Sequence, residues 1–191
     1  MDYPNRLLVN GQNDGHKTDS YGVLFTRDIG TRLKTSINLA ETNLKPRNSL
    51  TRGSKGLSWN VDLTGTLTSR LQLHLLVSRA LTNSLFTDSS YHIAKTYGVD
   101  AKYALNDALT LSGGYSYKTT KYIQSGVAIV GQPVIQPLGN DKRNAVFSSL
   151  SYNRNSRMTF VLSGGYGNRK ADNSFFNYSN KYASLGIQVR I

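Results

Sequence analysis

The sequence contains no cysteine, and this excludes a disulfide framework and thiolate metal sites. No stretch approaches the roughly 18 consecutive apolar residues that a membrane-spanning helix requires. Runs of Ala, Glu and Leu that favour helix are few, whereas the chain has 12 tyrosines and 17 glycines among abundant Ser, Thr and Asn. The 191 residues suffice for one domain. This composition predicts an almost wholly β structure.

Acidic residues are also few, and 11 Asp and Glu against 23 Lys and Arg leave a net charge of +12. Such a charge would suit a nucleic-acid partner. The basic residues are scattered, however, through turns, long loops and single strand positions, and neither a recognition helix nor an RNA-binding aromatic signature accompanies them. We therefore expect no nucleic-acid partner. The basic residues that fall in predicted turns are Arg32, Arg70, Arg154 and Arg157.

Apolar and polar residues alternate with a period of two along most of the chain. The segment LSWNVDLTGTLTSRLQLHLLV, residues 57–77, places nearly all of its apolar residues at odd positions. This alternation predicts a β-hairpin around Thr68-Ser69-Arg70, because successive side chains of a strand point to opposite faces. The same pattern predicts further strands at residues 20–27, 33–43, 96–105, 109–121, 144–152 and 158–169, and a last strand that ends the chain at Ile191.

The predicted connections alternate in length. Short ones cover residues 28–31, 68–70, 106–108 and 153–157, and long ones cover 44–56, 84–91, 123–143 and 170–177. Strands of about ten residues with tight turns at one end and long loops at the other are typical of transmembrane β-barrels. The fold class expected is all-β, an antiparallel up-and-down transmembrane β-barrel with about nine strands here, as part of a larger barrel. The apolar, proline-bearing loop 123–143 could constrict a pore, cover its mouth as a lid or be a mobile external loop.

Tyrosines on the apolar parity favour the membrane interpretation, because rings with a polar tip suit a lipid interface. An antiparallel β-sandwich with tyrosines at the rim of its core remains the alternative. The tyrosines expected at the lipid interface are Tyr97, Tyr103, Tyr115, Tyr117, Tyr152 and Tyr166.

The opposite parity predicts a polar lumen in which basic residues outnumber acidic ones. A cationic lining favours the passage of anions. The alternative is that these charges only solvate and cross-link the barrel interior. The residues expected to line the lumen are Lys34, Asn38, Asp62, His74, Asp100, Lys102, Lys118, Arg169 and Arg190.

One histidine could carry chemistry. With Leu67 opposite Leu71, His74 faces Thr64 and lies diagonal to Asp62, within reach of a carboxylate–imidazole contact. No strained serine turn or second acid/base pair accompanies it, so we favour a hydrogen-bonded structural histidine over catalysis. The other histidines are in predicted loops and offer no metal cluster. We expect no enzymatic activity, no metal and no cofactor.

Three segments carry a resemblance to a family: GLSWNVDLTGTLTSRLQLHLLVSRAL, YHIAKTYGVDAKYALNDALTLSGGYSYKTTKY and FSSLSYNRNSRMTFVLSGGYGNRKADNSFFNYSNKYASLGIQVRI. In each, a strand, a T-x-R-L or N-D-x-L turn, a second strand and a polar loop follow one another. Residues 19–191 thereby resemble the C-terminal part of the putative β-barrel porin family associated with exopolysaccharide-biosynthesis and exosortase systems. The chain departs from this pattern by ending in Ile191 rather than an aromatic residue, and family members are much longer.

The resemblance implies a passive outer-membrane channel of Gram-negative bacteria linked to exopolysaccharide production or export. Its partners would be outer-membrane lipid, the barrel assembly machinery, and polysaccharide or small anionic solutes. A structural or adhesive surface barrel with a closed lumen, and a soluble β-sandwich binding module, are the alternatives.

The odd number of predicted strands bears on domain organisation, because single-chain bacterial barrels have even counts. We expect residues 19–191 to form the barrel domain, as the C-terminal portion of a longer one. Residues 1–18 would then be a polar leader or the remnant of an extracellular loop, without the features of a signal peptide. The alternative is that the second to ninth strands close an eight-stranded barrel.

Overall fold

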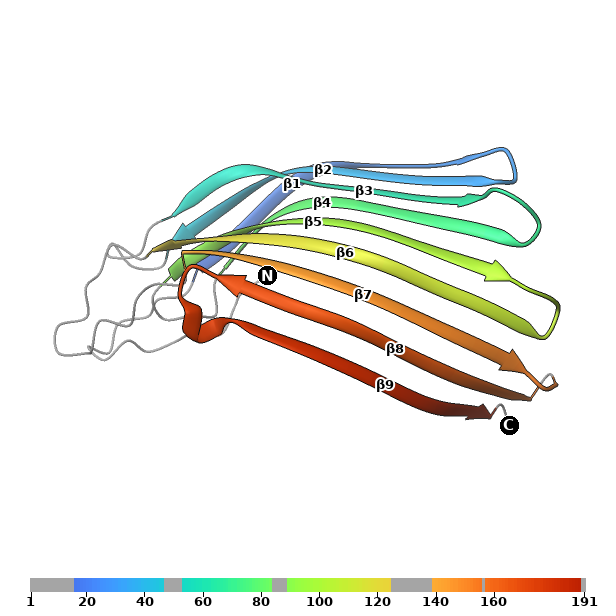
Figure 1. Ribbon diagram of the computed structural model, residues 1–191. Helices are drawn as coiled ribbons and strands as arrows, with labels where there is room; N and C mark the ends of the chain where they lie inside the picture. Colours follow the sequence, from blue (N-terminus) through green and yellow to red (C-terminus); the bar gives the residue numbers. More distant parts are fainter. Residues whose placement is uncertain (1–15, 47–52, 84–88, 125–138, 156, 190–191) are drawn as a thin grey trace.

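The computed structural model describes residues 16–46, 53–83, 89–124, 139–155 and 157–189. They form a single nine-stranded sheet in which each strand pairs antiparallel with the next in sequence (Figure 1). The all-β, up-and-down fold expected from the sequence is confirmed. The strands are β1 (His16–Ile29), β2 (Leu33–Pro46), β3 (Ser54–Thr66), β4 (Leu71–Asn83), β5 (Ser89–Ala104), β6 (Leu109–Gln124), β7 (Asn140–Asn153), β8 (Met158–Ala171) and β9 (Tyr178–Val189).

The tight turns that follow β1, β3, β5 and β7 lie at one end of the sheet, which we call the short-turn end (Figure 1). Strands β2, β4, β6 and β8 finish at the opposite end, which we call the long-loop end. The connection from β8 to β9 contains the 3-10 helix η1 (Ser174–Phe176). No helix in the described residues is long and apolar enough to cross a membrane. Most of loop 123–143 lies outside the described residues, and so the three roles considered for it stay predictions.

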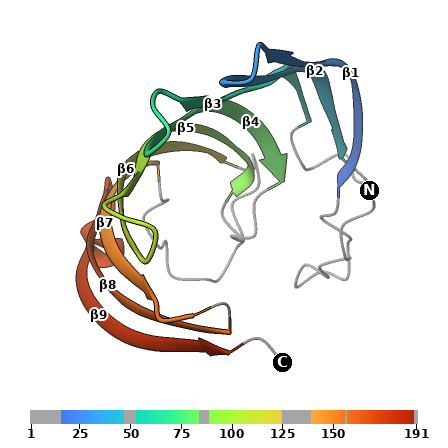
Figure 2. The same cartoon turned by 90° about the vertical axis from the view of Figure 1, so that its right-hand side faces the viewer.

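The sheet is curved but not closed (Figure 2). β1 pairs with β2 along its length, and β9 pairs with β8. The alternative of an eight-stranded barrel closed between β2 and β9 is therefore wrong for the described strands, because β1 occupies the edge of β2 that such closure would need. An open, curved meander is what part of a larger barrel looks like.

Cross-strand register sorts the side chains onto two faces. Leu63, Leu75, Val99, Tyr115 and Val146 are consecutive partners from β3 to β7, so the apolar parities of neighbouring strands coincide on what we call the apolar face. The apolar parity moves to even positions in β7, because odd-numbered Tyr115 of β6 pairs with even-numbered Val146. Residues of the opposite parity form the polar face. Large side chains remain exposed on the apolar face, for example Leu185 at 77%.

The buried hydrophobic cluster is small and lies at the long-loop end. It consists of Leu44, Leu81 and Tyr91, with Ile93 and Ile123 packed against it. β3 pairs with β4 only from Trp59 towards the short-turn end. Because the two strands separate beyond that point, Leu44 of β2 can reach Leu81 of β4.

Aromatic rings lie across glycines on the polar face. A Cβ on Gly114 would be 2.7 Å from a ring atom of Phe147, and one on Gly165 would be 2.6 Å from the ring of Tyr182. Phe147, which breaks the apolar parity of β7, thus fills the space above a glycine, a known means of stabilising strand glycines. Side chains from neighbouring strands converge on the concave side of a curved sheet, so this crowding identifies the polar face as the concave one.

Three of the short turns share one hydrogen-bonding pattern. The side-chain oxygen of Thr68 accepts from the backbone N–H groups of Arg70 and Leu71, at 3.2 and 3.0 Å. Asn106 and Asn155 make the equivalent bonds two and three residues onward. The repeated T-x-R-L and N-D-x-L cadence is therefore a turn signature, since Thr and Asn side chains satisfy turn amides.

Candidate functional site: the charged polar face

His74 lies between two carboxylates on the polar face, towards the short-turn end. Its Nε2 is 3.2 Å from Oδ1 of Asp62 on β3, and its Nδ1 is 2.9 Å from Oδ1 of Asp100 on β5. Thr64 is its direct partner on β3, which confirms the predicted register and the diagonal contact with Asp62. The contact with Asp100 was missed, because it depends on the register of β4 with β5 across a long connection.

This arrangement suits hydrogen bonding better than metal binding. A neutral imidazole carries one N–H and can donate to one carboxylate, whereas the protonated ring donates to both. Among the described residues, no group of three or more His, Cys, Asp or Glu side chains is arranged to hold a metal ion. His74 thus links β3, β4 and β5 across the polar face.

A second charged cluster lies at the long-loop end of the polar face. The carboxylate of Asp141 is fully buried, with Oδ2 at 2.6 Å from Arg169 and 3.3 Å from Arg143. The hydroxyl of Tyr122 donates to the same oxygen at 3.3 Å. Sequence reasoning placed Asp141 inside loop 123–143 and missed the cluster, because a strand extended by polar residues shows no apolar alternation.

The two arginines continue a row of positive charge. Lys118, Arg143 and Arg169 are consecutive cross-strand partners on β6, β7 and β8. The guanidinium of Arg169 also lies 5.6 Å from the ring centroid of Phe176, a cation–π distance. We call Lys118, Arg143 and Arg169 the basic rim. Asp141 pairs with two of these three cations, Arg143 and Arg169, so the described side chains of the rim carry a net positive charge.

Of the remaining predicted lumen residues, Lys34, Asn38 and Lys102 share the polar face and belong to neither cluster. Lys34 is opposite Asp28, and Lys102 is opposite Gln72 and Ser112. Asn38 is opposite Asn60, and Arg190 lies outside the described residues. Acidic partners are more numerous than the sequence prediction allowed, because Asp28 and Asp141 had not been assigned to this face. Whether these residues line a lumen stays a prediction.

The six predicted interface tyrosines share the apolar face. Tyr103 and Tyr152 lie towards the short-turn end, and Tyr152 stacks on Phe160 with ring centroids 6.4 Å apart. Tyr97 and Tyr117 are direct partners, with ring centroids 6.3 Å apart. Tyr115 and Tyr166 lie in one register row, two residues nearer the short-turn end. The two groups are about 20 Å apart along the strands at the usual rise per residue. Two separated aromatic rows fit the girdles of membrane barrels, and contact with lipid stays a prediction.

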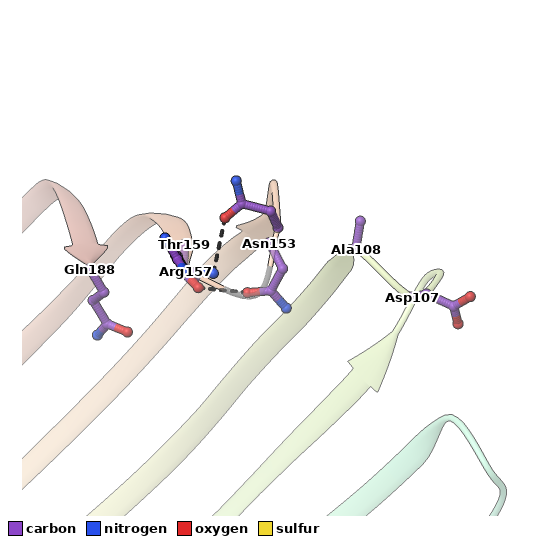
Figure 3. A pocket seen from close by; sticks show the side chains of 7 residues that line it. Asp107, Ala108, Asn153, Arg157, Thr159 and Gln188 are labelled. Atoms are coloured by element: carbon purple, nitrogen blue, oxygen red, sulfur yellow. Dashed lines mark hydrogen bonds between the residues drawn. The ribbon is translucent and has the colours of Figure 1, made fainter. Parts of the chain in front are cut away.

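A pocket of about 510 Å³ opens at the short-turn end (Figure 3). Its lining includes Asp107 from the β5–β6 turn, Thr159 from β8 and Gln188 from β9. The hydroxyl of Thr159 donates to the side-chain oxygen of Asn153 at 2.8 Å. The lining is polar and carries one acidic and one basic side chain, Asp107 and Arg157.

The comparison with protein families agrees with this geometry. No curated protein matches the chain. Residues 46–191 match the family described as putative beta-barrel porin 2, and this region covers β3 to β9. A porin-family β-barrel resides in a membrane. Apolar and polar residues alternate along its strands, its tight turns gather at one end of the sheet, and the family match covers most of its length. The chain therefore belongs to the putative β-barrel porin 2 family.

Proposed function

We propose that the protein forms a passive channel in the bacterial outer membrane and admits anionic solutes. We further propose a link to exopolysaccharide production or export, with acidic polysaccharide as a candidate solute. The family membership supports a porin-like barrel. The concave polar face supports an aqueous interior, because a barrel in lipid places its polar parity inward.

The observation that carries the anion preference is the basic rim. Lys118, Arg143 and Arg169 follow one another on three adjacent strands, and within the described ranges Asp141 is the one carboxylate that pairs with any of them. Long loops of outer-membrane barrels face outward, so the rim would lie at the external mouth. A concentration of positive charge at a mouth raises the local concentration of anions and lowers their barrier to entry.

The proposed channel needs no cofactor and no catalytic step. Hydrogen bonds from His74 to Asp62 and Asp100 would link three adjacent strands on the channel wall. Outer-membrane lipid would surround the apolar face, and insertion would depend on the barrel assembly machinery.

Single-channel recording on the whole protein, refolded and inserted into planar phospholipid bilayers, tests this proposal. We expect stepwise, voltage-independent conductance. A barrel that inserts but stays silent would overturn the channel and favour a structural or adhesive surface barrel with a closed lumen.

A further inference from the structure

We propose that a second basic row, on the apolar face at the long-loop end, binds the phosphate groups of a phosphorylated glycolipid in the surrounding leaflet. This inference rests on the proposed outer-membrane location but does not depend on an open channel. The outer basic row consists of Arg79, Lys95, Lys142 and Lys170, with Lys121 one step beyond.

The register aligns this row at a single height across five strands. Arg79 of β4 is opposite Lys95 of β5, Lys95 is opposite Thr119 of β6, and Thr119 is opposite Lys142 of β7. Lys142 is then opposite Lys170 of β8. Lys95, Lys121, Lys142 and Lys170 are exposed, and Arg79 is half-buried. Five neighbouring strands about 4.8 Å apart extend the row over about 19 Å.

Like charges lie directly opposite each other in this row. Arg79 and Lys95 form one such pair, and Lys142 and Lys170 form another. Directly opposed like charges destabilise a sheet, because their Cβ atoms are only about 5 Å apart. An anion that bridges the pairs would remove this cost.

On strands β1 to β3, basic residues at the same end form ion pairs. At the long-loop end of β1 to β3, Asp19 binds Lys45 at 2.9 Å and Glu41 binds Lys55 at 2.9 Å. In the part of the chain that the structure describes, the lysines of the outer basic row have no such ion pair. Asp172, which lines the same depression as the row, already accepts from the backbone and side-chain amides of Asn140.

A shallow depression of about 480 Å³ gives the row a concave shape. Four of its lining side chains are cations, two are carboxylates and the rest are uncharged: Arg79, Lys95, Lys121 and Lys142, then Asp141 and Asp172, then Ile93, Thr119, Thr120 and Asn140. Lys95 lies two residues beyond Tyr97, or about 7 Å along the strand. If the tyrosines mark the lipid interface, the cations lie at headgroup height, where lysine side chains extend towards water.

The length of the row selects the ligand. Phosphate suits Lys and Arg because its oxygens accept several charge-assisted hydrogen bonds. A phospholipid with one phosphate neutralises one segment of a row about 19 Å long. A glycolipid with several phosphates, of the lipid A type, reaches several cations at once and gains from multivalency.

The test compares two variants with equal charge loss. One carries Lys95→Gln, Lys121→Gln, Lys142→Gln and Lys170→Gln. Its matched control carries Arg32→Gln, Arg70→Gln, Arg154→Gln and Arg157→Gln, which removes the same charge from exposed turn residues at the opposite end. Each whole protein, refolded in neutral detergent, is titrated with lipid A, with dephosphorylated lipid A and with phosphatidylglycerol, and bound lipid is measured by native mass spectrometry.

We expect the unchanged protein and the control to bind lipid A at least tenfold more tightly than the dephosphorylated lipid or phosphatidylglycerol. The lysine variant should lose this preference. Equal binding of lipid A and its dephosphorylated form, equal binding of phosphatidylglycerol, or equal loss in both variants would overturn the proposal. Conductance in bilayers free of glycolipid separates this result from the proposed function: a silent barrel that still prefers lipid A fails as a channel while the glycolipid site stands.

Discussion

The ring of Phe147 on β7 occupies the space where a side chain on Gly114 of β6 would lie. Asp100 of β5 closes that space from the other side, because its Cβ would also be 2.7 Å from a Cβ at position 114. The two contacts couple β5, β6 and β7 on the polar face, next to the His74–Asp100 hydrogen bond.

Gly114→Ala should therefore destabilise the barrel by about 1–3 kcal/mol, the usual cost of overpacking. Gly186→Ala is the matched control, since nothing lies within 4 Å of a Cβ at that strand position. It should leave the free energy of unfolding within about 0.5 kcal/mol of the original. Urea unfolding in lipid vesicles, followed by tryptophan fluorescence, measures both. Equal effects of the two substitutions would show that the ring of Phe147 does not fill this space.

The side chain of Asn106 should stabilise the β5–β6 turn. Asn106→Ala removes an acceptor for two backbone amides, at 2.9 and 2.8 Å, and should cost about 1 kcal/mol. Asp107→Ala changes the exposed neighbouring residue and should cost less than half as much. The same urea titration compares them, and identical unfolding midpoints would contradict the role assigned to this side chain.

His74 and Asp100 should be energetically coupled. A double-mutant cycle with His74→Gln and Asp100→Asn should give a coupling free energy of about 0.5–1 kcal/mol, a modest value because both side chains are partly exposed. A second cycle with Asp62→Asn should give less, since that contact is longer, 3.2 Å against 2.9 Å. Strictly additive changes in the free energy of unfolding would mean that the hydrogen bonds of His74 contribute nothing to stability.

The strand order and most strand positions could be predicted from the sequence. A strand whose two faces meet different surroundings has apolar and polar residues in alternation. The hairpin from Leu57 to Val77 shows this well: a turn of fixed length sets the register, so the contact between His74 and Asp62 followed from counting residues.

Counting residues did not predict the register of two strands joined by a long connection. Strand β5 begins at Ser89, well before the predicted start at residue 96, and β7 begins at Asn140 rather than residue 144. The extension of β7, Asn140 to Arg143, is polar on both faces and shows no apolar alternation. The extension of β5 carries only two large apolar side chains on one face, Tyr91 and Ile93, before Lys95 interrupts the pattern. The contacts of Asp100 and Asp141 depend on those registers, and so they became visible only in three dimensions.

The anion preference of the proposed channel is its most directly measurable property. A rim variant carrying Lys118→Gln, Asp141→Asn, Arg143→Gln and Arg169→Gln removes a net charge of two without leaving Asp141 buried and unpaired. Its control, Lys34→Gln with Lys102→Gln, removes the same net charge at the short-turn end. The measurement is the reversal potential across a planar bilayer under a potassium chloride gradient. The account predicts an anion-selective potential for the unchanged protein, a clear shift towards cation selectivity for the rim variant and a smaller shift for the control. A cation-selective unchanged channel, or equal shifts in the two variants, would contradict it.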